Sequence, residues 1–264
     1  MYEKYEMKWF NFKNKKQLCP TVTFATTCWN CDWKKILLDE EYLSKYQIAN
    51  HNFSFFEKIL VVNNVNEKEY VIQKAKNKVN KGVLTNFYDA DKYAEEVMSF
   101  FSLEKKDFKA GKDAKYYIGV DDNWLYYNAL GVLTSIYHCK SDYLLYLTGD
   151  SFLKQSVSWI DKAITMMEKK SNYKVANLIW NEKYDEAKKE SYRKNKDFFI
   201  SKKGFSDQLF LVKRKDFQDN IYNEIRDDAA HFPRGDVFEK RVYSYMINHG
   251  WKRITFRHGS YYHN

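Results

Sequence analysis

The sequence contains few cysteines and prolines, and they are poorly placed for a redox or zinc site. Its 264 residues include four cysteines, Cys19, Cys28, Cys31 and Cys139, which is too few for a disulfide scaffold in a chain of this length. Cys28 and Cys31 form a Cys-x-x-Cys motif after an apolar stretch, a pattern typical of dithiol oxidoreductases. Such a site also expects a proline in the loop that faces the dithiol, but the only prolines are Pro20 and Pro233. We therefore interpret Cys28 and Cys31 as small, semi-buried residues at a strand-to-helix turn.

Glycine-rich phosphate-binding motifs and long apolar runs are also missing. The chain has nine glycines, and they form neither Gly-x-Gly-x-x-Gly nor Gly-x-x-x-x-Gly-Lys-Ser/Thr, so a Rossmann fingerprint and a Walker loop are excluded. No apolar run approaches the roughly 18 residues that a membrane span needs, and the amino terminus lacks the apolar core of a signal peptide. We expect a cytoplasmic protein.

Basic and aromatic residues are abundant instead. Lysine and arginine number 44 against 35 acidic residues, a net charge of +9, and aromatics make up 18%. This excess suits a partner rich in phosphate: a nucleotide ligand, a nucleic acid, or an anionic membrane in peripheral contact. The acidic residues are interspersed among the basic ones, and no RNA-binding or zinc motif is present, so we rank a nucleic-acid binder below a nucleotide-binding protein.

Strand and helix patterns alternate along the chain. Hydrophobic spacing predicts strands over 21–27, 55–63, 142–147 and 173–180, and helices over 33–46, 67–81, 90–101, 124–139 and 152–170. We interpret the polar stretch 182–203 as a solvated helix or loop and the segment 204–210 as a returning strand. Alternation of this kind predicts the α/β class, with an open, mostly parallel central sheet flanked by helices. Ligands of such sheets bind where strands end.

One predicted strand closes in an acidic turn. The segment 142–151 reads DYLLYLTGDS, and a carboxylate at a strand tip can coordinate a hard divalent cation that bridges two phosphates. The segment resembles the metal-binding strand of GT-A glycosyltransferases, which ends in Asp-x-Asp. Thr148 stands in place of the first aspartate, so the resemblance carries over only Asp150, as a ligand for Mn²⁺ or Mg²⁺ and the nucleotide diphosphate.

The same resemblance assigns the nucleotide pocket. It implies a GT-A-like fold in which Thr26 and Thr27, at the tip of the first strand, hold the nucleotide. Asn63 or Asn64, after the second strand, would recognise the base through an amide donor and acceptor. Asn128, on the helix before the acidic strand, is a further contact candidate, although a polar helix-face residue would look the same.

Catalytic candidates follow near the end of the chain. The run GDVFEKRV at 235–242, followed by Gly250 and Trp251, resembles the acidic helix start of inverting GT-A enzymes, where a carboxylate is the catalytic base. Asp236 and Glu239 both fit, since i,i+3 spacing places them on one helix face, and we place Asp236 slightly ahead because an aspartate after Pro-Arg-Gly should stand at the start of the helix, facing the cleft. The resemblance also implies that the carboxy-terminal run supplies Arg257 to the diphosphate and His258 or His263 to the metal.

These expectations describe one GT-A-like domain over residues 1–264. A nucleotide-sugar-binding half covers about 18–150, and an acceptor-binding and catalytic half covers about 151–264. The implied activity is transfer of a sugar from a nucleotide-diphosphate donor to a glycan or lipid-linked acceptor in glycan biosynthesis, with inversion. A GT-A-like domain that binds the donor without catalysis is the alternative, because the first motif aspartate is missing. A nucleotidyltransferase would need a glycine-rich basic amino-terminal loop that this chain lacks.

Overall fold

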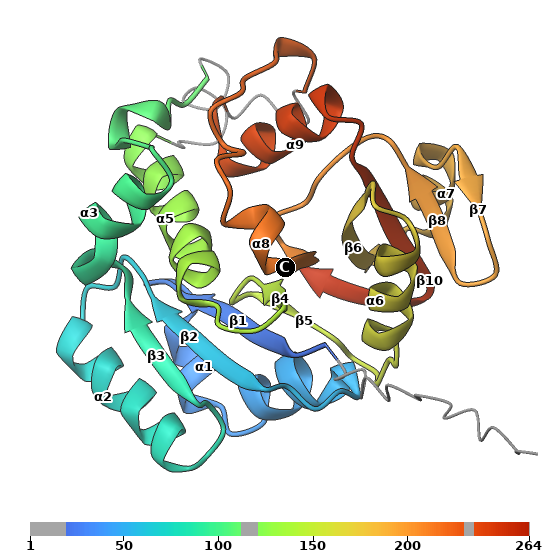
Figure 1. Ribbon diagram of the computed structural model, residues 1–264. Coiled ribbons are helices and arrows are strands. Elements are labelled where there is room, and N and C mark those ends of the chain that lie inside the picture. The colour runs from blue at the N-terminus through green and yellow to red at the C-terminus, as the bar shows by residue number, and fades with distance from the viewer. Residues whose placement is uncertain (1–19, 112–120, 230–234, 264) are drawn as a thin grey trace, which may run out of the picture.

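A single large sheet runs through the protein. Within the residues that the computed structural model describes, 20–111, 121–229 and 235–263, it has ten strands in the order β3-β2-β1-β4-β9-β6-β10-β8-β7, with β5 paired to β10 (Figure 1). The strands are β1 (Val22–Cys28), β2 (Glu57–Val62), β3 (Asn86–Asp89), β4 (Tyr143–Leu147), β5 (Ser151–Phe152), β6 (Tyr173–Trp180), β7 (Arg193–Lys194), β8 (Phe198–Ser201), β9 (Leu209–Lys213) and β10 (Lys252–His263).

Most of this sheet runs in one direction. Strands β3, β2, β1 and β4 pair in parallel, and β6 pairs in parallel with β10. The two groups are joined by β9, which is antiparallel to both β4 and β6. As a result β1, β2, β4, β6 and β10 all end at one edge, which we call the carboxyl edge, and β9 begins there. The expected α/β class with a mostly parallel central sheet is confirmed.

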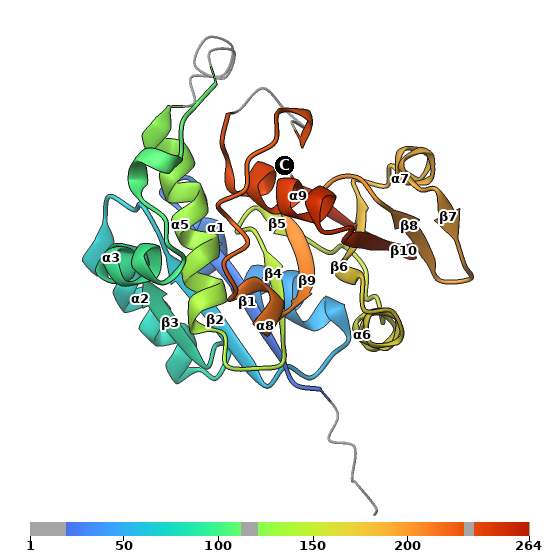
Figure 2. The same cartoon turned by 45° about the horizontal axis from the view of Figure 1, so that its top comes forward.

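Helices cover both faces of the sheet. They are α1 (Trp33–Leu38), α2 (Lys68–Asn80), α3 (Ala90–Phe100), α5 (Asp122–His138), α6 (Ile160–Lys169), α7 (Tyr184–Glu190), α8 (Arg214–Phe217) and α9 (Phe238–Asn248). Short turns of other helical types are η1 (Tyr42–Ile48), η2 (Ala49–His51), η3 (Lys105–Asp107) and η4 (Asp227–Ala229). Alternate side chains of each strand face opposite ways, and two buried clusters result. One lies under α3, α5, α8 and α9, and the other under α1, η1, α2 and α6. Figure 2 shows α8 and α9 beside α5.

Helix α5 approaches the sheet closely at one glycine. An added Cβ on Gly131 would lie 2.8 Å from the Asn63 amide nitrogen and 3.0 Å from the Thr27 methyl carbon. Both neighbours sit at or just after the ends of β1 and β2, so Gly131 lets the helix close over the tips of these strands.

Four expected elements differ from the structure. The returning strand expected over 204–210 begins only at Leu209, as β9. The helix expected over 33–46 stops at Leu38 and continues as the π-helical turn η1. The helix expected from residue 152 begins at Ile160, because Phe152 pairs with β10 in strand β5. The polar stretch 182–203 holds not only α7 but also the hairpin β7–β8, whose strand β8 is fully buried.

Helix α7 and strands β7 and β8 lie at the margin of the molecule beyond β10 (Figure 1). Helix α7 buries none of its residues. Among the described residues, none of the helices combines the length and the apolar character that crossing a membrane requires.

Candidate active site at the carboxyl edge of the sheet

The turn after β4 meets the last residues of β10 at the carboxyl edge. Strand β5 begins at Ser151, directly after Asp150, and pairs with the end of β10 through the positions Ser151–His263 and Phe152–Tyr262. This short pairing brings His263 against Asp150, with 3.1 Å between the imidazole Nε2 and the carboxylate Oδ2. Both side chains keep part of their surface open to solvent, 25% for His263 and 40% for Asp150.

The surroundings of Asp150 favour its ionised form. Burial alone would raise its pKa, but the hydrogen bond and charge of His263, together with the Thr148 hydroxyl, lower the pKa below its usual value. Thr148 thus occupies the place expected for a first aspartate, and its hydroxyl helps to keep Asp150 in the carboxylate form that binds a cation. Its hydroxyl also lies 2.7 Å from the Ser151 hydroxyl.

A second carboxylate, Asp32, approaches the same turn. Its Oδ1 accepts a hydrogen bond of 2.6 Å from the Trp29 backbone N–H. Its Oδ2 would lie 2.7 Å from a Cβ added to Gly149, and the Thr27 carbonyl oxygen would lie only 2.3 Å from that Cβ. Residue 149 must therefore be glycine for β1, Asp32 and the acidic turn to pack this closely.

The pKa of Asp32 reflects this crowding. Burial, with a contribution from the charge of Asp150, raises it to about 7, although the bond from the Trp29 N–H acts in the opposite direction. Burial and the Asp32 charge also raise the pKa of the two nearby thiols, Cys28 and Cys31, both of which are free. A dithiol redox site needs lowered thiol pKa values, so this environment is the opposite of a reactive one.

The residues expected around the nucleotide differ in their exposure to solvent. Thr27 shares a hydrogen bond of 3.2 Å with the Tyr146 hydroxyl, and its backbone borders Gly149. Thr26 and Asn63 are fully buried. The Asn63 amide donates to the Tyr127 carbonyl of α5 over 2.7 Å, so this side chain ties β2 to the helix. Asn64 is exposed in a left-handed turn with φ of 49°, and Asn128 is partly exposed on α5.

Two buried acceptor atoms lie at these strand ends. The Thr26 hydroxyl and the Asn63 side-chain oxygen have no hydrogen-bond partner among the described residues. Both are enclosed, so we do not read them as direct contacts for a base. Asn64, which follows β2 into solvent, is the more accessible of the two expected amides.

The two catalytic candidates face different surroundings. Asp236 precedes α9 and forms an ion pair of 3.0 Å with Lys240, while its backbone N–H bonds the Lys109 carbonyl over 2.9 Å. Glu239 lies in the first turn of α9 and acts electrostatically on Tyr261, a residue of β10 two positions before His263. Burial chiefly raises the pKa of Tyr261, and the charges of Glu239 and Asp207 raise it further.

The structure does not bring the other two carboxy-terminal candidates to Asp150. Arg257 donates to the Asn195 carbonyl over 2.6 Å, and His258 contacts the Lys196 carbonyl over 3.0 Å, so both attach to the β7–β8 turn. His258 precedes His263 by five residues of strand, on the order of 15 Å along the chain.

Sequence reasoning missed one polar residue at this edge, Asp32. It stands directly after the Cys-x-x-Cys motif, which directed the interpretation to the cysteines, although an acidic residue shortly after a strand tip is itself a signal for a ligand site. Asn181 follows β6 and bonds the backbone of His263 on both sides, with 3.0 Å from the His263 N–H to Oδ1 and 3.2 Å from Nδ2 to the His263 carbonyl.

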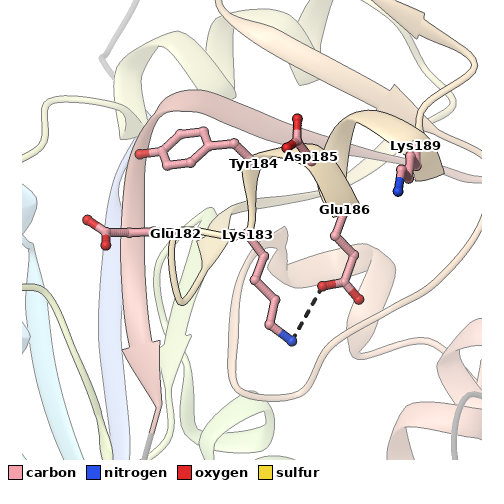
Figure 3. A pocket seen from close by; sticks show the side chains of 6 residues that line it. All are labelled: Glu182, Lys183, Tyr184, Asp185, Glu186 and Lys189. Atoms are coloured by element: carbon pink, nitrogen blue, oxygen red, sulfur yellow. Dashed lines mark ion pairs between the residues drawn. The ribbon is translucent and has the colours of Figure 1, made fainter.

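An open cavity of about 670 Å³ lies beside the turn at Asn181 and Glu182 that follows β6. It is lined by Glu182, Lys183, Tyr184, Asp185, Glu186 and Lys189 (Figure 3). Figure 3 shows Glu182 and Tyr184 pointing to one side of the turn, away from the Lys183–Glu186 ion pair. The neighbouring Trp180, at the end of β6, is 37% exposed, with Lys183 Nζ 3.8 Å from its ring centre.

Few side chains at the acidic turn could bind a metal ion. Within residues 20–111, 121–229 and 235–263, the structure places no three histidine, cysteine, aspartate or glutamate side chains together so that they could hold a metal ion. Asp150 and His263 nevertheless offer one carboxylate and one imidazole side by side. Divalent cations such as Mg²⁺ are often bound by one or two protein side chains, with phosphate oxygens and water completing the shell.

Comparisons with known proteins find similarity in the fold and not in the sequence. No protein-family model and no curated protein matches the sequence. Among solved structures, the chain is similar to the mannosyltransferase PcManGT from Pyrobaculum calidifontis in complex with GDP-Man and Mn²⁺, with a TM-score of 0.49 and 12% identity. That match covers 92% of this chain and 56% of the mannosyltransferase, so this chain spans little more than half of its length.

Two further structures are similar at the same level. The galactosyltransferase LgtC, in complex with donor and acceptor sugar analogues, matches with a TM-score of 0.44 and 12% identity, covering 92% of this chain and 73% of its own. GalNAc-T7 with UDP, GalNAc and Mn²⁺ matches with a TM-score of 0.47 and 12% identity, covering 94% of this chain and 44% of its own. All three belong to the class of enzyme that the sequence motifs resemble, but a likeness this weak assigns no residue.

Proposed function

We propose that this chain is a glycosyltransferase that takes a sugar from a nucleotide-diphosphate donor with the help of Mn²⁺ or Mg²⁺. The observation that carries the proposal is the contact between Asp150 and His263 at the carboxyl edge. Ligands of open α/β sheets bind at this edge. Carboxylate oxygens suit Mg²⁺ and Mn²⁺, and imidazole is a common ligand of transition metals.

Asp150 and His263 would hold the cation, and the donor diphosphate would complete its shell. When bound, the cation would neutralise charge that develops on the leaving diphosphate. Thr27, whose backbone borders Gly149, the exposed Asn64 after β2, and the partly exposed Asn128 of α5 are proposed to contact the nucleotide. In this arrangement the donor lies mainly on the half of about 18–150, while His263 reaches it from the half of about 151–264.

The reaction we propose is a single displacement with inversion. The acceptor oxygen forms a bond to the anomeric carbon as the bond from that carbon to the diphosphate oxygen breaks. The hydroxyl proton of the acceptor passes to a carboxylate, Glu239 or Asp236. Both candidates are kept: Asp236 precedes α9 and pairs with Lys240, and Glu239 lies in the first turn of the helix.

The acceptor is proposed to be a glycan or lipid-linked hydroxyl compound. The cavity beside α7 borders the Asn181–Glu182 turn and has two partly exposed aromatic rings close by, Trp180 and Tyr184. Aromatic faces with neighbouring polar groups suit a sugar ring, which has an apolar face and a rim of hydroxyls. The basic hairpin next to the cavity allows a peripheral contact with an anionic membrane.

The test is Mn²⁺ binding followed by electron paramagnetic resonance of the free ion, with and without UDP or GDP. We expect the nucleotide to strengthen Mn²⁺ binding, and we expect Asp150→Ala and His263→Ala to weaken it at least tenfold. His258→Ala is the matched control and should bind Mn²⁺ as the wild type does, since its ring is attached to the β7–β8 turn. Equal binding by all four proteins would refute the assignment of the site.

Turnover is tested separately by release of nucleoside diphosphate from a panel of UDP- and GDP-sugars without acceptor. Glu239→Gln should abolish release while Mn²⁺ and nucleotide still bind, and Asp236→Asn is the comparison. Donor binding with no release by the wild type, even when glycan acceptors are added, would favour the non-catalytic alternative.

A further inference from the structure

The turn that follows β6 has an unusual backbone. Asn181 and Glu182 are consecutive non-glycine residues with positive φ, 45° and 57°. The left-handed region is unfavourable for residues with a Cβ, and asparagine tolerates it better than most. Two such residues in a row persist only where the surrounding contacts hold them.

Apart from the turn's own hydrogen bond of 2.8 Å from the Lys183 N–H to the Trp180 carbonyl, the contacts that hold it come from the end of β10. The Asn181 N–H donates to the Tyr261 carbonyl over 2.8 Å, and the Glu182 N–H donates to the Ser260 hydroxyl over 2.9 Å. The Asn181 side chain then continues the ladder. Its Oδ1 accepts from the His263 N–H at 3.0 Å, and its Nδ2 donates to the His263 carbonyl at 3.2 Å.

The amide of Asn181 therefore takes the place of one more peptide group of β6. The parallel pairing of β6 with β10 stops at the positions Trp180 and Tyr261, two residues before His263. The left-handed turn directs the main chain away toward α7, and only the side chain extends the pairing. On its other side, His263 pairs with Ser151 of the two-residue strand β5.

These contacts fix the backbone of His263 from two sides. Its imidazole then lies 3.1 Å from the Asp150 carboxylate, which is itself next to Ser151. Without the Asn181 amide, only the short β5 pairing would hold the last described residue of the strand. We infer that Asn181 is a positioning residue, which holds His263 so that its ring faces Asp150.

This inference rests on the proposed function where it concerns the metal. If Asp150 and His263 bind Mn²⁺, loss of the Asn181 amide should weaken binding about tenfold, the lower end of the effect seen when a partner of a metal ligand is removed. The effect should pass through the imidazole. In a His263→Ala background, Asn181→Ala should cause no further loss.

The matched control is Asn52, a second asparagine with positive φ, 46°, whose amide bonds the Ser158 hydroxyl and not β10. Asn52→Ala introduces the same backbone strain away from the site and should leave Mn²⁺ binding unchanged. Asn181→Gly removes the amide without adding strain, since glycine accepts positive φ. It should weaken binding as much as Asn181→Ala.

A second measurement needs no metal. The ring nitrogen signals of His263 and those of its carbon-bound ring protons are identified by their loss in His263→Ala, in long-range ¹H–¹⁵N spectra of the metal-free protein. They should shift or broaden in Asn181→Ala and Asn181→Gly but not in Asn52→Ala. Circular dichroism verifies that each variant is folded.

The outcomes separate the two proposals. Unchanged His263 ring signals in both Asn181 variants would overturn the positioning role. Unchanged Mn²⁺ binding in those variants, while His263→Ala weakens it, would overturn the role in the site. If the wild type binds no Mn²⁺ but the ring signals move, the positioning role stands and the proposed metal function falls.

Discussion

The protein should lose stability in mild acid because of one buried histidine, His51. Its side chain is fully buried, and its Nδ1 accepts a hydrogen bond of 3.1 Å from the Trp159 indole N–H. The rings of Phe24, Phe55 and Trp159 surround it, with centres 6.1–6.3 Å away. Its Nε2 has no hydrogen-bond partner among the described residues. A proton on Nδ1 would face the indole N–H and destroy this bond.

The sign and size of the effect follow from the pKa. Burial lowers the pKa of His51 to about 3, whereas an imidazole in the unfolded chain titrates near 6.5. Above pH 6.5 neither state binds the proton, and His51 contributes nothing to pH dependence. Between 6.5 and about 3 only the unfolded state binds it, so stability falls by about 1.4 kcal/mol for each pH unit. At pH 4.5 the loss is about 2.7 kcal/mol.

The assay compares the free energy of unfolding in urea at pH 7.0 and pH 4.5 for the wild type and His51→Asn. Asparagine cannot titrate, and its side-chain oxygen can still accept from Trp159, so the variant removes the proton site with little change in hydrogen bonding. Any cavity it leaves costs the same at both pH values. Other acid-sensitive groups remain in both proteins and cancel in the difference.

We expect the wild type to lose about 2.7 kcal/mol more than His51→Asn between the two pH values. His258→Asn, which removes an exposed imidazole, is the control for loss of a histidine and should behave as the wild type does. Parallel losses in the wild type and His51→Asn, within about 0.5 kcal/mol, would refute the reasoning.

Three further predictions concern packing, two at the carboxyl edge and one under α9. Gly149→Ala places a Cβ 2.3 Å from the Thr27 carbonyl oxygen at a glycine whose φ is not positive, so its cost of about 1–3 kcal/mol in urea unfolding comes from the clash; an unchanged free energy of unfolding would contradict the clash. Thr27→Val removes the partner of the buried Tyr146 hydroxyl and should cost about 1 kcal/mol by the same measurement, which Tyr146→Phe should relieve. Arg241→Met removes the guanidinium that donates to the backbone carbonyls of Tyr222 and Asp107. We expect the free energy of unfolding to fall by about 3 kcal/mol. An unchanged free energy would show that water replaces the guanidinium.

The spacing of apolar residues predicted the strands and helices that bury a regular stripe or run of side chains. Strand β6 was expected at its observed bounds, and β1, β2, β4, α2, α3 and α5 were expected to within a few residues, because their apolar spacing matches a sheet or one helix face. Strand β10 was not expected. Its sequence, KRITFRHGSYYH, is rich in charged and polar side chains, and only its position between β6 and β8 explains why it is a strand.

The choice among the carboxy-terminal residues also depended on the fold. His258 and His263 carry the same imidazole, and the sequence left the choice between them open. The register of β10 against β6 shifts between Phe256 and Ser260, and this irregularity separates residues that attach to the β7–β8 turn from the one that reaches Asp150. A shift of this kind leaves no trace in hydrophobic spacing.

The threonine at position 148 shows how the acidic turn can lack its first aspartate. All the polar groups of Thr148 have partners: its N–H donates to the Gln208 carbonyl at 2.9 Å, its carbonyl accepts from Gln47 at 3.1 Å, and its hydroxyl meets Ser151 at 2.7 Å. An aspartate there would add a third carboxylate beside Asp150 and Asp32, and the pKa of Asp32 is already raised to about 7 in part by the charge of Asp150.

Nearby like charges disfavour ionisation, so an aspartate at position 148 would oppose the ionisation of Asp32 and Asp150 in the metal-free protein. Asp32 approaches the acidic turn from the loop after β1 and is the second carboxylate near Asp150. The turn is therefore built around Gly149, whose missing Cβ lets Asp32 approach, and the two carboxylates follow strands that are neighbours in the parallel pairing of β1 with β4.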